Sequence, residues 1–338
     1  MPNAKKITFK DLADALLDEE RPFPARYLHH FSDLSAADQA LLQKTWPNVP
    51  LRRRQSLMED LEQLGEADDL LSFEEVCRLA LHDGDPMVRA AAVRILTDYE
   101  LVEFIPVFSD LAEQDESAAV RAAAAQALGP FVYMGEVELL NPTVQRKLED
   151  KLLAIASGKD EASVRMRALE SLGYSGREEV VPLIEAAYQM GHAEWLATAL
   201  FAMGRSANSA WESKVLPMLD DRRPAVRSEA ATAAGGLELK TAVRRLLELL
   251  DDDDSQVRLA SIWALSEIGG PGVRSALTEM LENVEDDEEA QLLEDALDNL
   301  SFNDGSGGFE MLDVSESDEE DDEDLLYFED EEEEDVED

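Results

Sequence analysis

The chain has 338 residues and a formal net charge of −46, with 30 basic against 76 acidic side chains. This balance argues against binding to nucleic acids or anionic membranes, because both need basic side chains on the protein. The single cysteine, Cys77, excludes an internal disulfide, and no stretch approaches the 18 apolar residues of a membrane span, so we expect a cytoplasmic protein.

Residues 1–71 contain no repeat and are predicted to form an N-terminal helical cap. Amphipathic patterns favour helices over residues 9–17, 37–45 and 52–64. The last of these begins with Arg52-Arg53-Arg54, the one basic cluster of the chain. We interpret the cluster as a solvated helix face. The alternatives are a receiving site for the acidic C-terminal tail and a contact to nucleic acid.

A unit of about 31 residues recurs between residues 72 and 300. Its most regular part is a Val-Arg pair followed by Ala and Leu at helical spacing. The anchors fall at residues 88, 120, 164, 195, 226, 257 and 289. Only the step from 120 to 164 is longer, and it indicates an insertion near residues 129–141. Such regularity is typical of a solenoid built from stacked helical hairpins.

Each unit shows the same order of features. An acidic or proline-containing turn opens it, and the Asp or Ser in that turn is expected to cap the helix that follows. The first helix is rich in Ala, and Gly129, Gly173 and Gly204 are expected to end it in their units. A second, amphipathic helix follows. One hairpin cannot bury its own apolar face, so the units are predicted to stack around a continuous core.

The D-x-x-V-R-x-x-A-x-x-A-L-G pattern over residues 72–300 resembles the short HEAT repeats of the phycobilisome-lyase type. The whole chain resembles uncharacterised bacterial HEAT-repeat domain-containing proteins. The resemblance implies an all-α, right-handed α-solenoid. It is specific for the fold and weak for function, because the type includes scaffolds, bilin-attachment proteins and a di-iron hydroxylase.

The arginines that follow the anchor positions form a regular series. We interpret them as a structural ladder, in which each guanidinium pairs with an acid at its own or an adjacent helix start and fixes the repeat register. Phosphate binding is the alternative. Leu196 interrupts the series and marks its unit as a soft point or a special contact. The ladder arginines are Arg89, Arg121, Arg165, Arg227 and Arg258.

No motif for catalysis, nucleotide binding or a metal site occurs in the chain. The hydroxylases of the resembled type use paired His-Glu dipeptides, which this chain lacks, so that activity is rejected. We therefore expect no catalytic residue, no cofactor and no metal. A bilin-lyase-like or cofactor-maturation subunit stays open as the enzymatic alternative, with Tyr133, Trp195 and Trp211 as residues that would line a pigment groove.

Residues 301–338 are predicted to be a disordered acidic tail. From residue 303 to the end there are 20 acids and no base, and such runs repel themselves too strongly to pack. An apolar cluster interrupts the acids, as in the tails of chaperones that cover basic clients. It is a possible partner-binding segment, and it consists of Leu325, Leu326, Tyr327 and Phe328.

Taken together, the sequence predicts a monomeric, non-catalytic interaction scaffold or adaptor for a basic protein, with chaperone-like character. The second helices of the units are expected to line the concave side, as solenoids commonly bind partners there. A third hypothesis is that the tail folds onto Arg52–Arg54 and masks the site. The candidate partner-binding glutamates on the second helices are Glu185, Glu248, Glu279 and Glu282.

Overall fold

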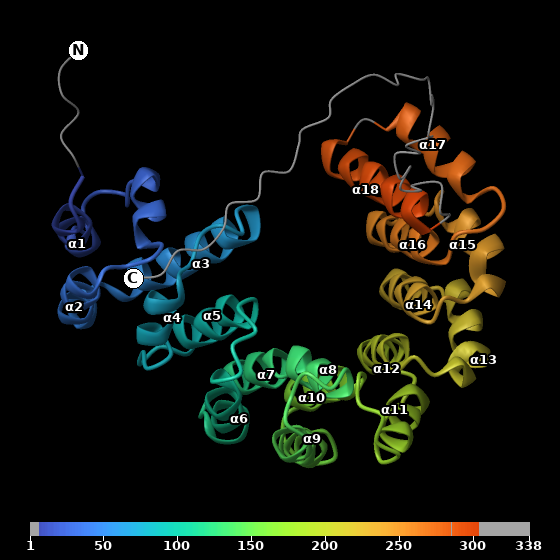
Figure 1. The fold of residues 1–338 in the computed structure, drawn as a ribbon, viewed down its shortest axis with the longest axis horizontal. Helices are drawn as coiled ribbons and strands as arrows, with labels where there is room; N and C mark the ends of the chain where they lie inside the picture. The colour runs from blue at the N-terminus through green and yellow to red at the C-terminus, as the bar shows by residue number, and fades with distance from the viewer. Residues whose placement is uncertain (1–6, 285, 304–338) are drawn as a thin grey trace, which may run out of the picture.

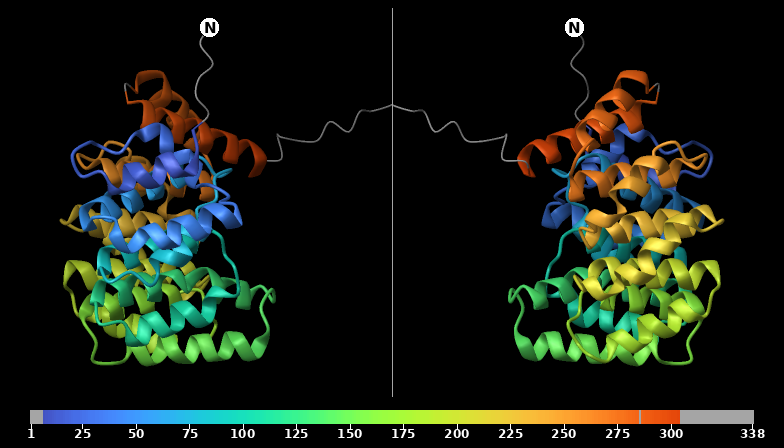
Figure 2. Two further views of the ribbon diagram at one scale, coloured as in Figure 1. Left: turned by 90° about the vertical axis from the view of Figure 1, so that its left-hand side faces the viewer. Right: turned by 90° about the vertical axis from the view of Figure 1, so that its right-hand side faces the viewer.

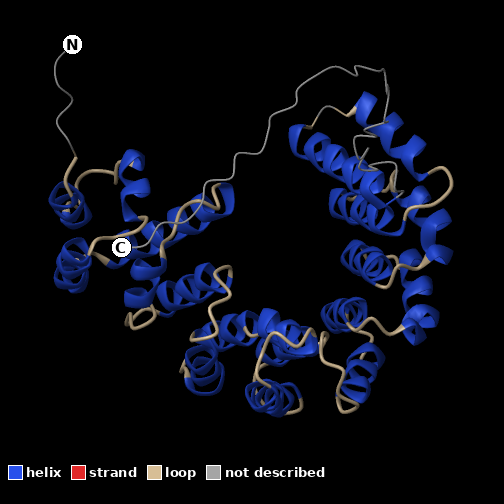
Figure 3. Cartoon of the chain, viewed as in Figure 1, coloured by secondary structure: helices blue, strands red, loops and turns tan. Residues whose placement is uncertain are grey.

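The structure is a computed structural model that describes residues 7–284 and 286–303. All regular elements of this part of the chain are helices (Figure 3). They follow an open arc in which α1–α3 and α16–α18 face each other across the opening (Figure 1). The side views show that most helices lie across the width of the arc (Figure 2). The prediction of an all-α solenoid is confirmed.

The arc consists of an inner and an outer row of helices (Figure 1). The inner row contains α3 (Leu51–Ala67), α5 (Pro86–Thr97), α7 (Ala118–Ala127), α10 (Ala162–Leu172), α12 (Ala193–Arg205), α14 (Pro224–Gly236), α16 (Ser255–Ile268) and α18 (Asp287–Asn303). The outer row contains α4 (Glu74–Ala80), α6 (Phe104–Gln114), α9 (Pro142–Ala156), α11 (Val180–Gln189), α13 (Glu212–Val215), α15 (Val243–Leu249) and α17 (Val273–Asn283).

Further helices complete the N-terminal end and the insertion. They are α1 (Phe9–Leu17), α2 (Ala36–Thr45) and α8 (Gly129–Glu136). Short stretches of 3-10 helix lie at Ala25–Phe31, Trp46–Asn48, Ser209–Trp211, Leu216–Asp220 and Lys240–Ala242. The α8 helix accounts for the long step in the repeat, because it lies between the inner helix α7 and the outer helix α9.

At two places, an aspartate in the turn caps the inner helix that follows, as the sequence predicts. The Asp85 carboxylate accepts hydrogen bonds from the backbone N–H groups of Met87 and Val88 at the start of α5. Asp254 does the same for α16. A side-chain oxygen at this position satisfies N–H groups that have no partner within the helix, which is worth about 1 kcal/mol.

The buried apolar side chains form one contiguous cluster that extends from Leu12 in α1 to Leu300 in α18. Each fully buried Leu or Val contributes roughly 1.5–3 kcal/mol, so the shared core stabilises units that would be unstable alone. Cys77 lies in this core, and burial raises the pKa of its thiol.

The glycines of the repeat have a different role from the expected one. Gly173 is the C-cap of α10 at a right-handed φ of −52°, Gly204 lies inside α12, and Gly129 is the first residue of α8. A Cβ atom on Gly204 would lie 2.8 Å from the Cα of Ala233 on the next inner helix. These residues are therefore small because neighbouring inner helices touch there, and the expectation that they end helices holds only for Gly173.

The close contacts at Gly and Ala also determine which row of helices lies on the concave side of the arc. The Ala-rich helices, which are the first helices of the predicted units, form the inner row, and the second helices form the outer row (Figure 1). The expectation that second helices line the concave side is wrong. The inner side of an arc is shorter, so its helices must pack more tightly, and only Gly and Ala permit that. The outer helix α6 instead buries large side chains, such as Phe104 and Phe108, whose rings stack on each other.

None of the helices in the described ranges combines the length and apolar character that a bilayer crossing requires.

Candidate functional site

The inner helices are held in register by arginines at their first turns. The Arg89 guanidinium donates two hydrogen bonds to the Asp115 carboxylate, at 2.9 Å from Nε and 2.8 Å from Nη2. Its Nη1 donates to the carbonyl oxygen of Asp83, at 2.9 Å. Asp115 also accepts from the backbone N–H of Ser117, at 2.8 Å. One arginine thus ties its own turn to the turn that starts the next inner helix.

Other ladder arginines repeat this geometry. Arg121 binds the Asp160 carboxylate and the Asp115 carbonyl, and Arg227 binds the Asp252 carboxylate and the Asp221 carbonyl. Arg258 contacts Glu289 at 3.4 Å and the carbonyl of Asp252 at 3.0 Å. The hydrogen bonds from Arg227 hold the pKa of Asp252 below its usual value. Paired in this way, these guanidinium groups are not free for a phosphate ligand.

The ladder is interrupted around α12. Arg165 donates to the carbonyl of Ala156 and lies over the Trp195 ring, with 5.3 Å between the guanidinium carbon and the ring centroid. The next ladder position is Leu196, which is buried. Asp221, which corresponds to the acceptors in the other turns, is bound instead by Arg223, two residues away.

Two of the three arginines of the basic cluster 52–54 form hydrogen bonds with other residues of the chain. Arg54 donates to the Asp83 carboxylate at 2.8 Å, so that the ladder begins in the predicted N-terminal cap. Arg53 donates to the carbonyl oxygens of Asp18 and Arg21. Only Arg52 of the three is exposed. The interpretation as one solvated face therefore holds for Arg52 alone, and little of the cluster remains free to receive the tail.

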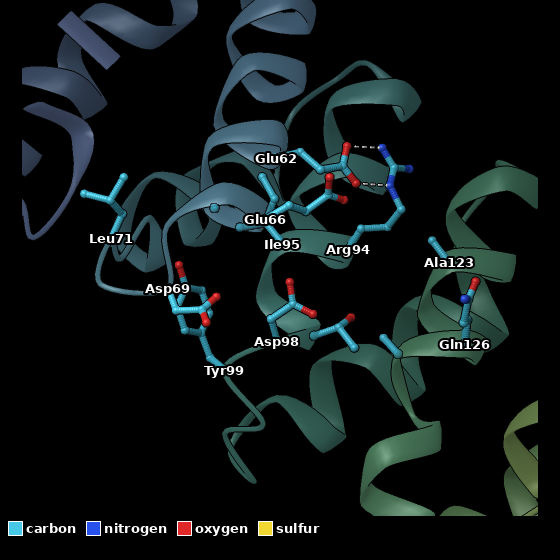
Figure 4. A pocket seen from close by; sticks show the side chains of 13 residues that line it. Glu62, Glu66, Asp69, Leu71, Arg94, Ile95, Asp98, Tyr99, Ala123 and Gln126 are labelled. Carbon is cyan, nitrogen blue, oxygen red and sulfur yellow. Dashed lines mark hydrogen bonds and ion pairs between the residues drawn. The ribbon is translucent and has the colours of Figure 1, made fainter. Parts of the chain in front are cut away.

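An acidic pocket of about 580 Å³ lies between the C-terminal halves of α3, α5 and α7 (Figure 4). Glu62 and Glu66 enter it from α3, Asp69 from the loop after α3, and Asp98 from the end of α5. The one basic side chain in its lining is Arg94, which binds both oxygens of Glu62, at 2.5 and 2.8 Å.

The electrostatics of this pocket favour a cation. Among the described residues, no basic group pairs with Glu66, Asp69 or Asp98. Burial raises the pKa of Asp98, and the neighbouring carboxylates of Glu66, Glu62 and Asp69 raise it further. Helix C-termini carry partial negative charge, and α3, α5 and α7 all end at the pocket. A positively charged side chain would therefore gain from the carboxylates and from the helix ends together.

These pocket residues were not singled out from the sequence. The usable signal is the spacing of Glu62 and Glu66, because residues four apart lie on one face of a helix. Asp69 and Asp98 gave no comparable signal. They join the pocket only because the ends of successive inner helices come together in the arc.

The glutamates proposed from the sequence lie elsewhere. All of them are on outer helices, so their expected place on the concave side is wrong, while contact with a partner stays a prediction. Glu185 is bound by Lys214 at 2.9 Å, and Glu248 by Arg245 at 2.8 Å. Glu279 and Glu282 are exposed on α17. The tail residues Leu325, Leu326, Tyr327 and Phe328 lie outside the described residues.

The residues named for a pigment groove do not share a surface. Tyr133 is 51% exposed on α8, whereas the Trp211 side chain is only 5% exposed. Trp195, on α12, has its ring covered by the guanidinium of Arg165. A buried indole cannot line an open groove, so this set gives no site for a bilin.

Comparison with known proteins identifies the repeat. A family model described as HEAT repeats matches residues 61–141 and 212–298. No protein with curated annotation is similar to the chain in sequence. The matched model covers HEAT repeats in general, so the phycobilisome-lyase type remains a resemblance of the motif.

Solved structures include similar chains at low sequence identity. YibA of Escherichia coli is 19% identical with a TM-score of 0.44, over 84% of this chain and 99% of that one. Human deoxyhypusine hydroxylase in complex with glycerol is 18% identical with a TM-score of 0.34, over 77% of this chain and 95% of that one. A designed armadillo repeat protein is 19% identical with a TM-score of 0.34, over 58% of this chain and 99% of that one.

The family match, the 31-residue period and the two rows of helices agree with one another. The chain belongs to the HEAT-repeat proteins.

Proposed function

We propose that this protein is a non-catalytic interaction scaffold that binds a basic segment of a client protein on its concave side. HEAT-type solenoids typically serve as protein-interaction scaffolds, because stacked units give a long curved surface. The observation that carries the proposal is the acidic pocket at the ends of α3, α5 and α7. Its unpaired carboxylates, Glu66, Asp69 and Asp98, lie together on the inner row.

The charge of the whole chain supports the same class of partner. Residues 1–302 carry 56 acids and 30 bases, so the repeat region is acidic without the tail. A field of this sign speeds the approach of a basic protein, and the pocket then fixes where it binds. Because exposed charges are screened over roughly 8 Å at physiological ionic strength, binding should weaken as salt is added.

Two double variants with the same change in charge test where the client binds. Glu66→Gln/Asp98→Asn neutralises the inner pocket, and Glu279→Gln/Glu282→Gln neutralises exposed glutamates of the outer helix α17. We expect the inner variant to bind an oligolysine peptide about tenfold more weakly, since two partly screened charge contacts are together worth about 1–2 kcal/mol. The outer variant should change the affinity less than about twofold. Fluorescence anisotropy at low salt measures both.

The reverse ranking, with the outer variant weaker and the inner variant unchanged, would place binding on the outer row and reject the proposal. Both variants should keep the helical circular dichroism signal of the unaltered chain. If the inner variant loses it, the single substitution Glu66→Gln on an exposed side chain replaces it in the comparison.

A further inference from the structure

A second pocket lies on the inner row where the arginine ladder is interrupted. It has a volume of about 380 Å³ and is formed by α10, α12 and α14. These are the helices between which Arg165 and Leu196 leave the usual pairs unformed. The interruption and the cavity therefore occur at the same place in the arc.

Two of the charged residues in this pocket are already paired. The Glu170 carboxylate accepts a hydrogen bond from Arg167 Nη1 at 2.5 Å and another from the Thr198 hydroxyl at 2.9 Å. The Glu170 side chain is 9% exposed. Each of its oxygens thus has a donor, and neither Glu170 nor Arg167 calls for an additional ligand.

Glu229 is different. It enters the pocket from α14, is partly buried, and has no hydrogen bond or ion pair with any described residue, whereas Glu194, the third acidic residue of the lining, is exposed. Burial, together with the charge of Glu170, raises the pKa of Glu229 to about 7, against the opposing charges of Arg167 and Arg205. A carboxylate that is partly withdrawn from water and has no partner is costly, so a cation that pairs with Glu229 would stabilise its ionised form.

The walls of the pocket are suited to an aliphatic chain. Met166, Ala197 and Phe201 provide apolar surface beside Glu229. Arg205 lies 4.0 Å from the centroid of the Phe201 ring, so one face of that ring already carries a guanidinium. Lysine combines a methylene stem with a compact charged head, and such a side chain covers apolar surface while its ammonium group reaches a polar partner.

We propose that this pocket takes a lysine side chain of the client, with the ammonium group against Glu229 and the methylene stem along Met166 and Phe201. The inference rests on the proposed function, because the lysine must come from a basic segment that lies along the concave side. It adds a second contact point, and it assigns a role to the unit in which the ladder is broken.

Protons should compete with lysine for this site. The ammonium group pairs with the ionised carboxylate, and at pH 6 only about one tenth of a carboxyl group with a pKa of about 7 is ionised. We therefore expect the full chain to bind a labelled oligolysine peptide about tenfold more weakly at pH 6 than at pH 8. Glu229→Gln should weaken binding about tenfold at pH 8 and remove the pH dependence. Anisotropy titrations at constant ionic strength measure these affinities.

The control is Glu282→Gln, which removes the same charge from an exposed outer position and should keep both the affinity and its pH dependence. Thermal melts verify folding, and Glu229→Gln should raise the melting temperature at pH 8 because it removes an unpaired, partly buried charge. The inference is overturned if Glu229→Gln binds oligolysine like the unaltered chain while Glu66→Gln/Asp98→Asn does not, a result that leaves the proposed function intact. If oligoarginine binds the unaltered chain as tightly as oligolysine does, and Glu229→Gln weakens both peptides equally, the assignment to lysine is overturned. No binding of oligolysine at pH 8 would reject the proposed function itself.

Discussion

Replacing Arg89 with alanine is expected to lower the free energy of unfolding by about 3–5 kcal/mol, because it leaves a buried carboxylate without its partner. The side chains of Arg89 and Asp115 are only 9% and 6% exposed. The substitution also removes the hydrogen bond to the carbonyl of Asp83, so two successive turns lose their link. Urea unfolding followed by circular dichroism measures the change.

Arg244→Ala is the matched control for this prediction. Arg244 is 93% exposed and contacts Glu248 on its own helix, so its loss should change stability by less than about 0.5 kcal/mol. An Arg89→Ala variant no less stable than this control would show that the ladder has no structural role.

The effect of Arg89→Ala should also depend on pH. Burial tends to raise the pKa of Asp115, but the hydrogen bonds from Arg89 and Ser117 outweigh it, and the net pKa lies below the usual 3.8. A carboxyl group whose folded-state pKa is lowered contributes stability above its unfolded pKa and loses that contribution as the pH falls through the folded value. The difference between the two proteins should therefore be full above about pH 5 and shrink below about pH 4.

Replacing Gly204 with alanine is expected to destabilise the protein by about 1–2 kcal/mol, although alanine is the better helix former. A Cβ atom would lie 2.8 Å from the Cα of Ala233, and a backbone atom cannot move aside alone. Overpacking of this kind costs about 1–3 kcal/mol, against a gain of up to about 1 kcal/mol in helix propensity. The inner helices would have to separate, so small-angle scattering should report a changed curvature together with the lower midpoint of unfolding.

Gly84→Ala provides the comparison, because a Cβ atom at this position would meet nothing within 4 Å. It should be neutral or slightly stabilising. If Gly204→Ala is as stable as Gly84→Ala, the close contact between inner helices does not limit the residue at position 204.

The fold was predictable from the sequence because the repeat specifies the same local structure many times. The Val-Arg anchors locate the inner helices, and the acidic turns at Asp85 and Asp254 cap them as expected. The spacing of the contacts also follows the period. Gly173 and Gly204 are 31 residues apart, as are their contact residues Ala202 and Ala233.

The orientation of the two rows does not follow from hydrophobic periodicity. An Ala-rich helix and an amphipathic helix each have an apolar face, and hydrophobic periodicity does not show which one lies on the shorter side of an arc. The discriminating signal was the glycine near the end of the first helix. Gly204 reads as a helix end in the sequence, whereas in the structure it marks a backbone contact between successive units.

The candidate pockets depend on contacts between units and are harder to read from one chain. Glu66 and Asp98 are 32 residues apart, and their proximity follows from the stacking of α3 on α5. Glu170 and Glu229 come from units that are not consecutive in the repeat, with α12 between them. By contrast, Leu196 was visible in the sequence as an interruption of the ladder, and the pocket that contains Glu229 lies in the same region.

Zero-length carbodiimide cross-linking of the full chain to an oligolysine peptide, with the sites mapped by mass spectrometry, tests the central claim most directly. This reaction joins a lysine amine to a carboxylate only where the two are in contact. We expect cross-links at Glu66, Asp69, Asp98 and Glu229. Cross-links confined to Glu185, Glu248, Glu279 and Glu282, or to residues 304–338, would contradict binding on the concave side.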